Sequence, residues 1–150
     1  MSVPALTPDQ VQRKSRMEIL ARSNSDELAH YWQEQVSHPS YSHLREPEIG
    51  LVMVRARSGG KGSRFNLGEM TITRCSVVLE DGTIGHGYVK GRDRRHAELA
   101  ALFDARFQQD DTSATFLTHI ENRLTSDRAV QSAKSAATKV EFYTMVRGED

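Results

Sequence analysis

Three β-prone segments follow one another with no helix between them, and this succession constrains the fold more than any other feature. Residues 49–57 (IGLVMVRAR) and 70–80 (MTITRCSVVLE) are rich in β-branched and apolar side chains. Residues 84–91 (IGHGYVKG) follow the DGT sequence at 81–83, which is a typical hairpin signal. Because parallel strands need a long crossover connection, the pattern predicts an antiparallel meander rather than a β–α–β unit.

Two helices are predicted before the strands. Thr7 is a good cap for the first, with Pro8 at the favoured first helical position. Ser25 is the expected cap of the second, which carries a leucine, a tyrosine and a tryptophan on one face. Residues 1–6 are expected to form a loose tail, and residues 37–48 (SHPSYSHLREPE) a polar loop.

Further helices are predicted after the strands. Arg92 or Asp93 opens one, a second begins near Asp111, and a third is capped by Ser126. Residues 140–146 (VEFYTMV) are β-prone and predict a last strand. The separation of helices from strands predicts an α+β fold, in which one domain spans all 150 residues. We expect an antiparallel sheet of about four strands with the helices packed on one face.

The composition limits the classes of function. The chain has 20 basic and 20 acidic residues, so its zero formal net charge predicts neither a nucleic-acid partner nor a membrane partner. Cys75 is the only cysteine, which excludes an intrachain disulfide and a multi-cysteine metal site, and we expect it to be a small buried hydrophobic residue. No metal is expected. Because the sequence shows no signal core and no run of 18 apolar residues, we expect a cytoplasmic protein.

The glycine-rich segment SGGKGSRFNLGE, residues 58–69, is the first candidate site. Its glycines allow a close backbone approach to a ligand, and its basic side chains suit a phosphate-rich ligand or an acidic partner surface. It is not a Walker A loop, because the GK[ST] ending and the following helix are absent. The alternative is a flexible solvated loop, although Phe65 and Leu67 have little place in one. The candidates are Gly59, Gly60, Lys61, Gly62, Arg64 and Phe65.

The segment GRDRRHAE, residues 91–98, is the second candidate site. A helix beginning here would present N–H donors and the positive end of its dipole beside Arg92. The HAE triplet also occurs in zinc deaminases, but those need a downstream cysteine pair that this chain lacks. We expect Arg92, Asp93 and His96 to form a helix start first, with any anion binding added to it. Arg147 is a further candidate, with a plain surface charge as the alternative.

Three blocks of the sequence resemble a known family. They are GLVMVRARSGGKGSRFNLGEMTITRCSV, DGTIGHGYVKGRDRRHAELAALFDA and EFYTMVRGED. Together they are similar to the G subunit (PhnG) of the bacterial carbon–phosphorus lyase core complex, from about residue 16 to the end of the chain. The resemblance implies a complex with I, H and J subunits, in two copies each, that works with an L protein.

The resemblance also implies a reaction. By this resemblance, the complex transfers ribose 5-triphosphate from MgATP to an alkylphosphonate and releases adenine, with the I subunit as the nucleosidase centre. MgATP is thus a substrate of the complex, no cofactor is expected on this chain alone, and catalysis by this chain alone is not expected. The family assigns no catalytic residue to this subunit, so we transfer none. We expect the candidate residues near the triphosphate or at the I-subunit interface; the alternative is a scaffold that touches no substrate.

Overall fold

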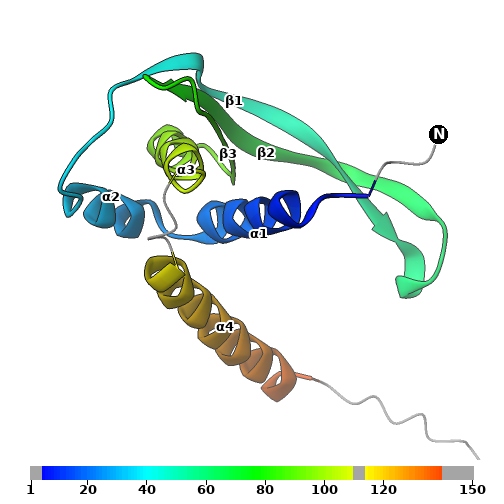
Figure 1. Ribbon diagram of the computed structural model, residues 1–150. Helices are drawn as coiled ribbons and strands as arrows, with labels where there is room; N and C mark the ends of the chain where they lie inside the picture. The colour runs from blue at the N-terminus through cyan, green and yellow to red at the C-terminus, as the bar shows by residue number, and fades with distance from the viewer. Residues whose placement is uncertain (1–4, 110–113, 140–150) are drawn as a thin grey trace, which may run out of the picture.

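The computed structural model describes residues 5–109 and 114–139 of the chain. Its elements, in order, are α1 Pro8–Arg22, α2 Ser25–Gln33, β1 Tyr41–Arg57, the 3₁₀ turn η1 Ser58–Gly60, β2 Arg64–Leu79, β3 Ile84–Lys90, α3 Arg94–Arg106 and α4 Ala114–Ala137 (Figure 1). The predicted strand at 140–146, Arg147 and the expected helix start near Asp111 lie outside the described residues. The fold is α+β, with a three-stranded antiparallel sheet and four helices packed against it, as one domain.

The three strands form the predicted meander, in the order β1-β2-β3. Two boundaries differ from the prediction, because β1 begins at Tyr41 inside the expected polar loop, and β2 begins at Arg64 inside the glycine-rich segment. The sequence of the early part of β1 is polar like that of a loop because this part of the strand is an exposed edge. Its pairing with β2 is interrupted around Arg45 and Glu48. Such irregularities allow Pro47 and polar residues in a strand.

Helix α3 lies directly on one face of the sheet, and two glycines of β3 make this possible. A Cβ atom at Gly85 would lie 2.0 Å from the carbonyl oxygen of Ala101, and one at Gly87 would lie 2.1 Å from that of Ala97. Any side chain at either position would therefore push the helix away from the strand. This close approach encloses a core in which Cys75 is fully buried, as expected.

The remaining helices cover the other side of α3 (Figure 1). The aromatic ring of Phe103 on α3 contacts Tyr31 and Trp32 of α2 and Phe116 of α4, and the rings of Tyr31 and Phe116 stack with centroids 3.7 Å apart. Aromatic contacts of this kind stabilise a helix layer beyond the area that they bury. The helices thus form one layered stack on one face of the sheet.

Three helix boundaries can be compared with the sequence. Thr7 caps α1 as predicted, through a capping box with Gln10. The predicted cap Ser25 is wrong by one residue, because the side chain of Asn24 accepts the N–H of Asp26. The two helices predicted after residue 110 are a single helix, α4, in which Ser126 is an exposed internal residue. None of the helices in the described parts of the chain is long and apolar enough to cross a membrane.

Candidate functional site

The outer parts of β1 and β2 leave the helices behind and project as a two-stranded arm (Figure 1). We define the arm as residues 49–57 and 64–72 with the turn 58–63 between them. Strand alternation places one set of apolar residues on each side of this ribbon. The exposed large side chains are Ile49, Leu51, Met53, Phe65 and Leu67, of which Leu51 is 62% and Leu67 is 64% exposed.

Such an arm is not expected to stand alone in water. An isolated pair of strands is marginally stable, and a run of exposed apolar residues marks an interaction surface. Val52 and Val54 on one side and Leu51 and Met53 on the other leave no purely polar side to face solvent. The arm therefore has the composition of a surface that another protein covers.

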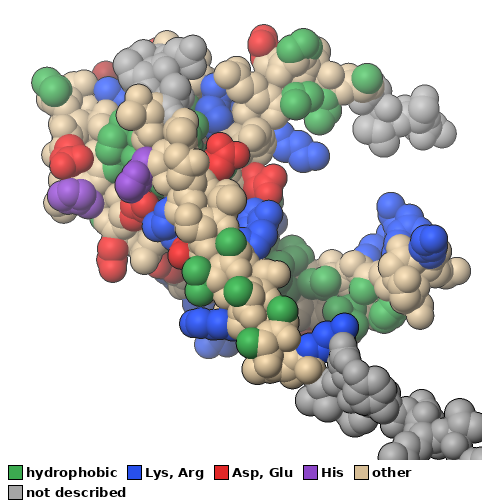
Figure 2. Space-filling model, turned by 90° about the horizontal axis from the view of Figure 1, so that it is seen from below, with side chains coloured by type: hydrophobic (Ala, Val, Ile, Leu, Met, Phe, Trp, Pro, Cys, Tyr) green, Lys and Arg blue, Asp and Glu red, His purple; other side chains and the backbone are tan. Residues whose placement is uncertain are grey.

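The tip of the arm is strongly basic. Residues 55–64 include Arg55, Arg57, Lys61 and Arg64 and contain no Asp or Glu. All four side chains are exposed, and Figure 2 shows Lys and Arg side chains gathered at the far end of the arm with hydrophobic side chains behind them. This separation gives the tip a local positive field in a chain of zero net charge.

The turn at the tip depends on its glycines. Gly59 and Gly60 have φ values of 57° and 76°, which L side chains rarely adopt. The N–H groups of Lys61 and Gly62 both donate to the carbonyl oxygen of Ser58, the latter at 2.8 Å. Because these donors are used within the turn, an anion at the tip would meet the side chains of Lys61 and Arg64 rather than a cradle of N–H groups.

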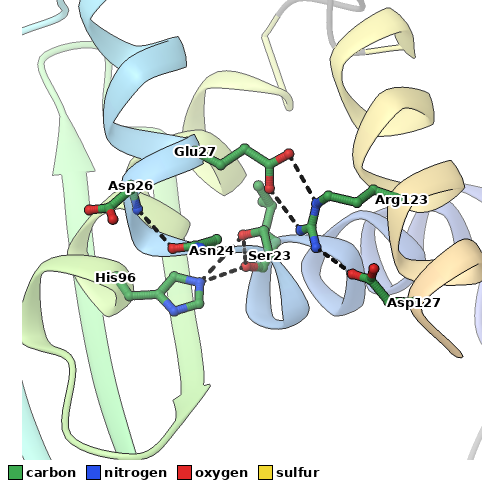
Figure 3. A network of polar contacts seen from close by, with 8 residues as sticks. Ser23, Asn24, Asp26, Glu27, His96, Arg123 and Asp127 are labelled. Atoms are coloured by element: carbon green, nitrogen blue, oxygen red, sulfur yellow. Dashed lines mark hydrogen bonds and ion pairs between the residues drawn. The ribbon is translucent and has the colours of Figure 1, made fainter. Parts of the chain in front are cut away.

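The second candidate block forms a helix start, as predicted. Asp93, and not Arg92, is the cap of α3, because its carboxylate accepts the N–H of His96 at 2.8 Å. The imidazole of His96 is buried, with Nε2 2.9 Å from the carbonyl oxygen of Leu20 and 3.4 Å from the hydroxyl of Ser23 (Figure 3). The ring thus joins the start of α3 to the end of α1, and this use accounts for the histidine without a ligand.

The two candidate blocks are not adjacent in space. The N–H of Gly91 donates to the carbonyl oxygen of Thr71, at the base of the arm. Arg64, at the start of β2, precedes Thr71 by seven residues, which is about 23 Å of extended strand. Arg92 is exposed near the base and the basic tip is remote from it, so one small ligand would not contact both.

The sequence did not predict a cluster of polar side chains around Glu98. Its carboxylate accepts from the Tyr41 hydroxyl at 2.9 Å and Arg95 at 2.8 Å, and lies 3.0 Å from Nε2 of His43. Burial alone would raise the pKa of Glu98, but these hydrogen bonds and the charge of Arg95 outweigh it and hold the pKa below its ordinary value. The saturated carboxylate ties β1 to α3. The only available signal was the alternation of Tyr41 and His43, in a segment assigned to a loop.

Two further kinds of site can be assessed in the described residues, a metal site and a reactive thiol. Residues 5–109 and 114–139 contain no group of three His, Cys, Asp or Glu side chains placed to hold a metal ion. Burial raises the pKa of the Cys75 thiol to about 11, which keeps it protonated and unreactive at neutral pH.

Helix α4 is a second projection. Arg123 donates to the carboxylate of Glu27 on α2 at 2.8 and 3.3 Å and to Asp127 at 3.0 Å, which fixes the first half of α4 on the domain (Figure 3). From residue 125 to residue 137 every side chain is exposed. This half of α4 mixes polar side chains with alanines and the exposed Val130, and it extends beyond the domain without a packed face of its own.

A small α+β domain with an apolar, basic-tipped arm belongs to the class of proteins that act through association. The sequence comparison then gives the family: a model described as "Phosphonate metabolism protein PhnG" matches residues 11–148, and the chain belongs to this family. It is also similar to "Alpha-D-ribose 1-methylphosphonate 5-triphosphate synthase subunit PhnG" of Rhizobium meliloti (strain 1021), with 43% identity over 142 residues. The alignment covers 93% of this chain and 91% of the relative, and confirms the predicted family.

Proposed function

We propose that this protein is the G subunit of an α-D-ribose 1-methylphosphonate 5-triphosphate synthase. In this role it supports the transfer of ribose 5-triphosphate from MgATP to an alkylphosphonate, with release of adenine. The similarity to a synthase subunit over 93% of the chain supports the reaction. The projecting arm, apolar along its length and basic at its tip, is the observation that carries the role of a non-autonomous subunit.

The proposal includes partners and a division of labour. The partners are the I, H and J subunits of a cytoplasmic complex, with the L protein as a functional partner. The reacting groups belong to a companion subunit, of which the I subunit is the first choice. MgATP is a substrate of the complex, and this chain binds no cofactor of its own.

The arm suggests how the chain contributes. Its apolar sides would lie against the companion subunit, with Phe65 as an anchor, and burial of such side chains gives about 25 cal/mol per Å². Docking would bring Arg57, Lys61 and Arg64 to the companion's surface as one unit. A ribose triphosphate carries several negative charges, and arginine pairs with phosphate oxygens through two parallel hydrogen bonds. The tip would thus hold the triphosphate while the companion performs the displacement.

The alternative is a scaffold that holds the I-subunit dimer and contacts no substrate. The same arm would serve it, with the basic tip facing acidic residues of the partner. The two roles differ in what the loss of one charge does. A ligand role predicts normal assembly with weakened use of MgATP, and a scaffold role predicts failed assembly.

The test uses the complete complex with the L protein, MgATP and methylphosphonate. Size exclusion reports assembly, and adenine release reports activity. For Arg64→Gln we expect normal co-elution and at least a tenfold loss of adenine release at subsaturating MgATP; Arg22→Gln, an exposed site on α1, is the matched control. Phe65→Ser should weaken assembly itself. Adenine release that is unchanged when this chain is omitted would refute the proposal.

A further inference from the structure

Strand β3 is an edge of the sheet, and its backbone groups divide into two sets. Gly85, Gly87 and Val89 pair with β2, which is shown by the flanking bonds from Leu79 to Thr83 and from Gly91 to Thr71. The N–H and C=O groups of Ile84, His86, Tyr88 and Lys90 therefore point to the free edge. An exposed edge of this kind is a template for another strand.

The first part of this edge is closed by side chains of the same domain. The carbonyl oxygen of Ile84 accepts from Arg13 at 3.3 Å and from Gln108 at 2.9 Å. The N–H of His86 donates to the carboxylate of Asp104 at 2.9 Å. These contacts protect the edge against pairing where they occur.

The second part of the edge is open. Neither the carbonyl oxygen of His86 nor the N–H and C=O of Tyr88 meets a partner in residues 5–109 and 114–139. They border a groove of about 560 Å³ between α1 and β3, with a mainly apolar lining that includes Met17, Leu20, Ala21 and Ala100. Unpaired backbone groups beside an apolar groove are what strand addition requires, because the first give affinity and the second receives side chains.

We propose that this open edge receives an extended segment of a companion synthase subunit by strand addition, an inference that rests on the proposed function. The segment would bond to Tyr88 and to the carbonyl oxygen of His86, with its inward side chains small and apolar. The charged side chains beside the groove specify one more feature of the partner segment. Glu18 pairs with Arg22 and Arg13 pairs with Asp104, while Lys14 has no ion pair in the described parts of the chain. An Asp or Glu of the segment opposite Lys14 would complete the match.

A segment of the same chain is the weaker occupant. Helix α4 runs away from the domain, and the 14 helical steps from Arg123 to Ala137 carry the chain about 21 Å beyond the contact with Glu27. Helix α4 thus leads the chain away from the groove rather than toward β3 (Figure 1).

Residue-resolved amide hydrogen exchange tests this inference. The Tyr88 amide is the reporter, and the Gly87 amide, which is paired with β2, is the internal reference. We expect Tyr88 to exchange fast in the isolated chain and at least tenfold more slowly in the assembled complex, with Gly87 slow in both. Equal rates for Tyr88 in the two states would overturn the inference. Slow exchange of the Tyr88 amide in the dilute isolated chain would mean that a segment of the same chain covers the edge. Exchange that slows only at higher protein concentration would mean that a second copy of the chain covers it. Either result would also overturn the inference.

A pair of variants tests the same edge by association. Tyr88→Pro removes the outward N–H, and proline is tolerated in an edge strand where the N–H faces outward. Tyr88→Ala removes the side chain and keeps the N–H. We expect at least tenfold weaker assembly for the proline variant and near-normal assembly for alanine; equal affinities would count against strand addition. If the complex forms and releases adenine while Tyr88 stays unprotected, this inference fails and the proposed function stands. If the chain neither joins the complex nor affects adenine release, both fail.

Discussion

The carboxylate of Asp104 on α3 accepts a hydrogen bond from the guanidinium of Arg13 on α1 at 2.8 Å, across 91 positions of the chain. Asp104 is only 2% exposed, and it also accepts the N–H of His86 on β3. One buried carboxylate therefore joins two helices and the edge of the sheet. Its position explains why α1 lies beside β3 and forms the wall of the groove.

Asp104→Asn should destabilise the domain strongly. The amide has the same shape but no charge, so Arg13 loses its ionic partner in a partly buried place. Breaking such a pair from one side costs about 3 kcal/mol. Urea unfolding of the isolated chain measures the change, and Asp127→Asn on the exposed surface of α4 should leave the free energy of unfolding nearly unchanged. An equal response of the two variants would contradict the role of Asp104.

Gly87→Ala should also be strongly destabilising. The new Cβ would lie 2.1 Å from the carbonyl oxygen of Ala97, so α3 would have to move away from β3. Overpacking costs about 1–3 kcal/mol, and we expect the upper end of this range because the clash is with a backbone atom. Gly50→Ala is the matched control, because a Cβ there meets nothing within 4 Å. Thermal unfolding should show a clear drop in Tm for the first variant and little change for the second.

His96→Ala should lower stability without impairing chemistry in the assembled complex. The substitution removes one of the donors to the carbonyl oxygen of Leu20, which also accepts from the Ser23 hydroxyl at 2.6 Å, and it creates a cavity, at a cost of about 2 kcal/mol. His30→Ala, at an exposed site on α2, should change stability by less than about 0.5 kcal/mol. Adenine release per assembled complex should equal that of the wild type. A loss of turnover with unchanged stability would instead place His96 at a ligand.

Glu98→Gln should change the acid sensitivity of the fold. Because the folded-state pKa of Glu98 lies below its ordinary value of 4.5, the charged carboxylate stabilises the fold above about pH 4.5, and this contribution is lost as the pH falls through the lowered pKa. The difference in unfolding free energy between wild type and Glu98→Gln should be largest near pH 6–7 and shrink on acidification. Denaturant unfolding at a series of pH values from neutral to acidic measures this difference in free energy, with Glu121→Gln as an exposed control. A difference that does not vary with pH would exclude this linkage.

Local signals in the sequence were sufficient for much of the fold. The capping box of Thr7 and the antiparallel meander both depend on residues close together in the chain. The start of β1 at Tyr41 was not predictable in this way, because that part of the strand exists through pairing with β2 across an irregular register. The prediction that Ser126 caps a helix was wrong because α4 continues through this residue. The ion pair of Arg123 with Asp127 spans the expected break.

The candidate sites were predictable to a different degree. The charge of the tip is a local property, so Lys61 and Arg64 could be read from the sequence as a basic group. The surroundings of His96 are not local, because the carbonyl oxygen that it binds is 76 positions away. The open edge of β3 was hidden for the same reason. Only the folded structure shows that Arg13 and Asp104 close one part of the β3 edge and leave the part at Tyr88 open.

The arm also bears on how such a protein must be supplied in the cell. A chain made in excess of its companions would keep Leu51, Phe65 and Leu67 in contact with water, beside an unpaired strand edge. Surfaces of this kind recruit chaperones, proteases or other copies of the same chain. If a companion subunit covers the arm as proposed, balanced synthesis of the two becomes a structural requirement, and the abundance of this chain should follow that of its companion.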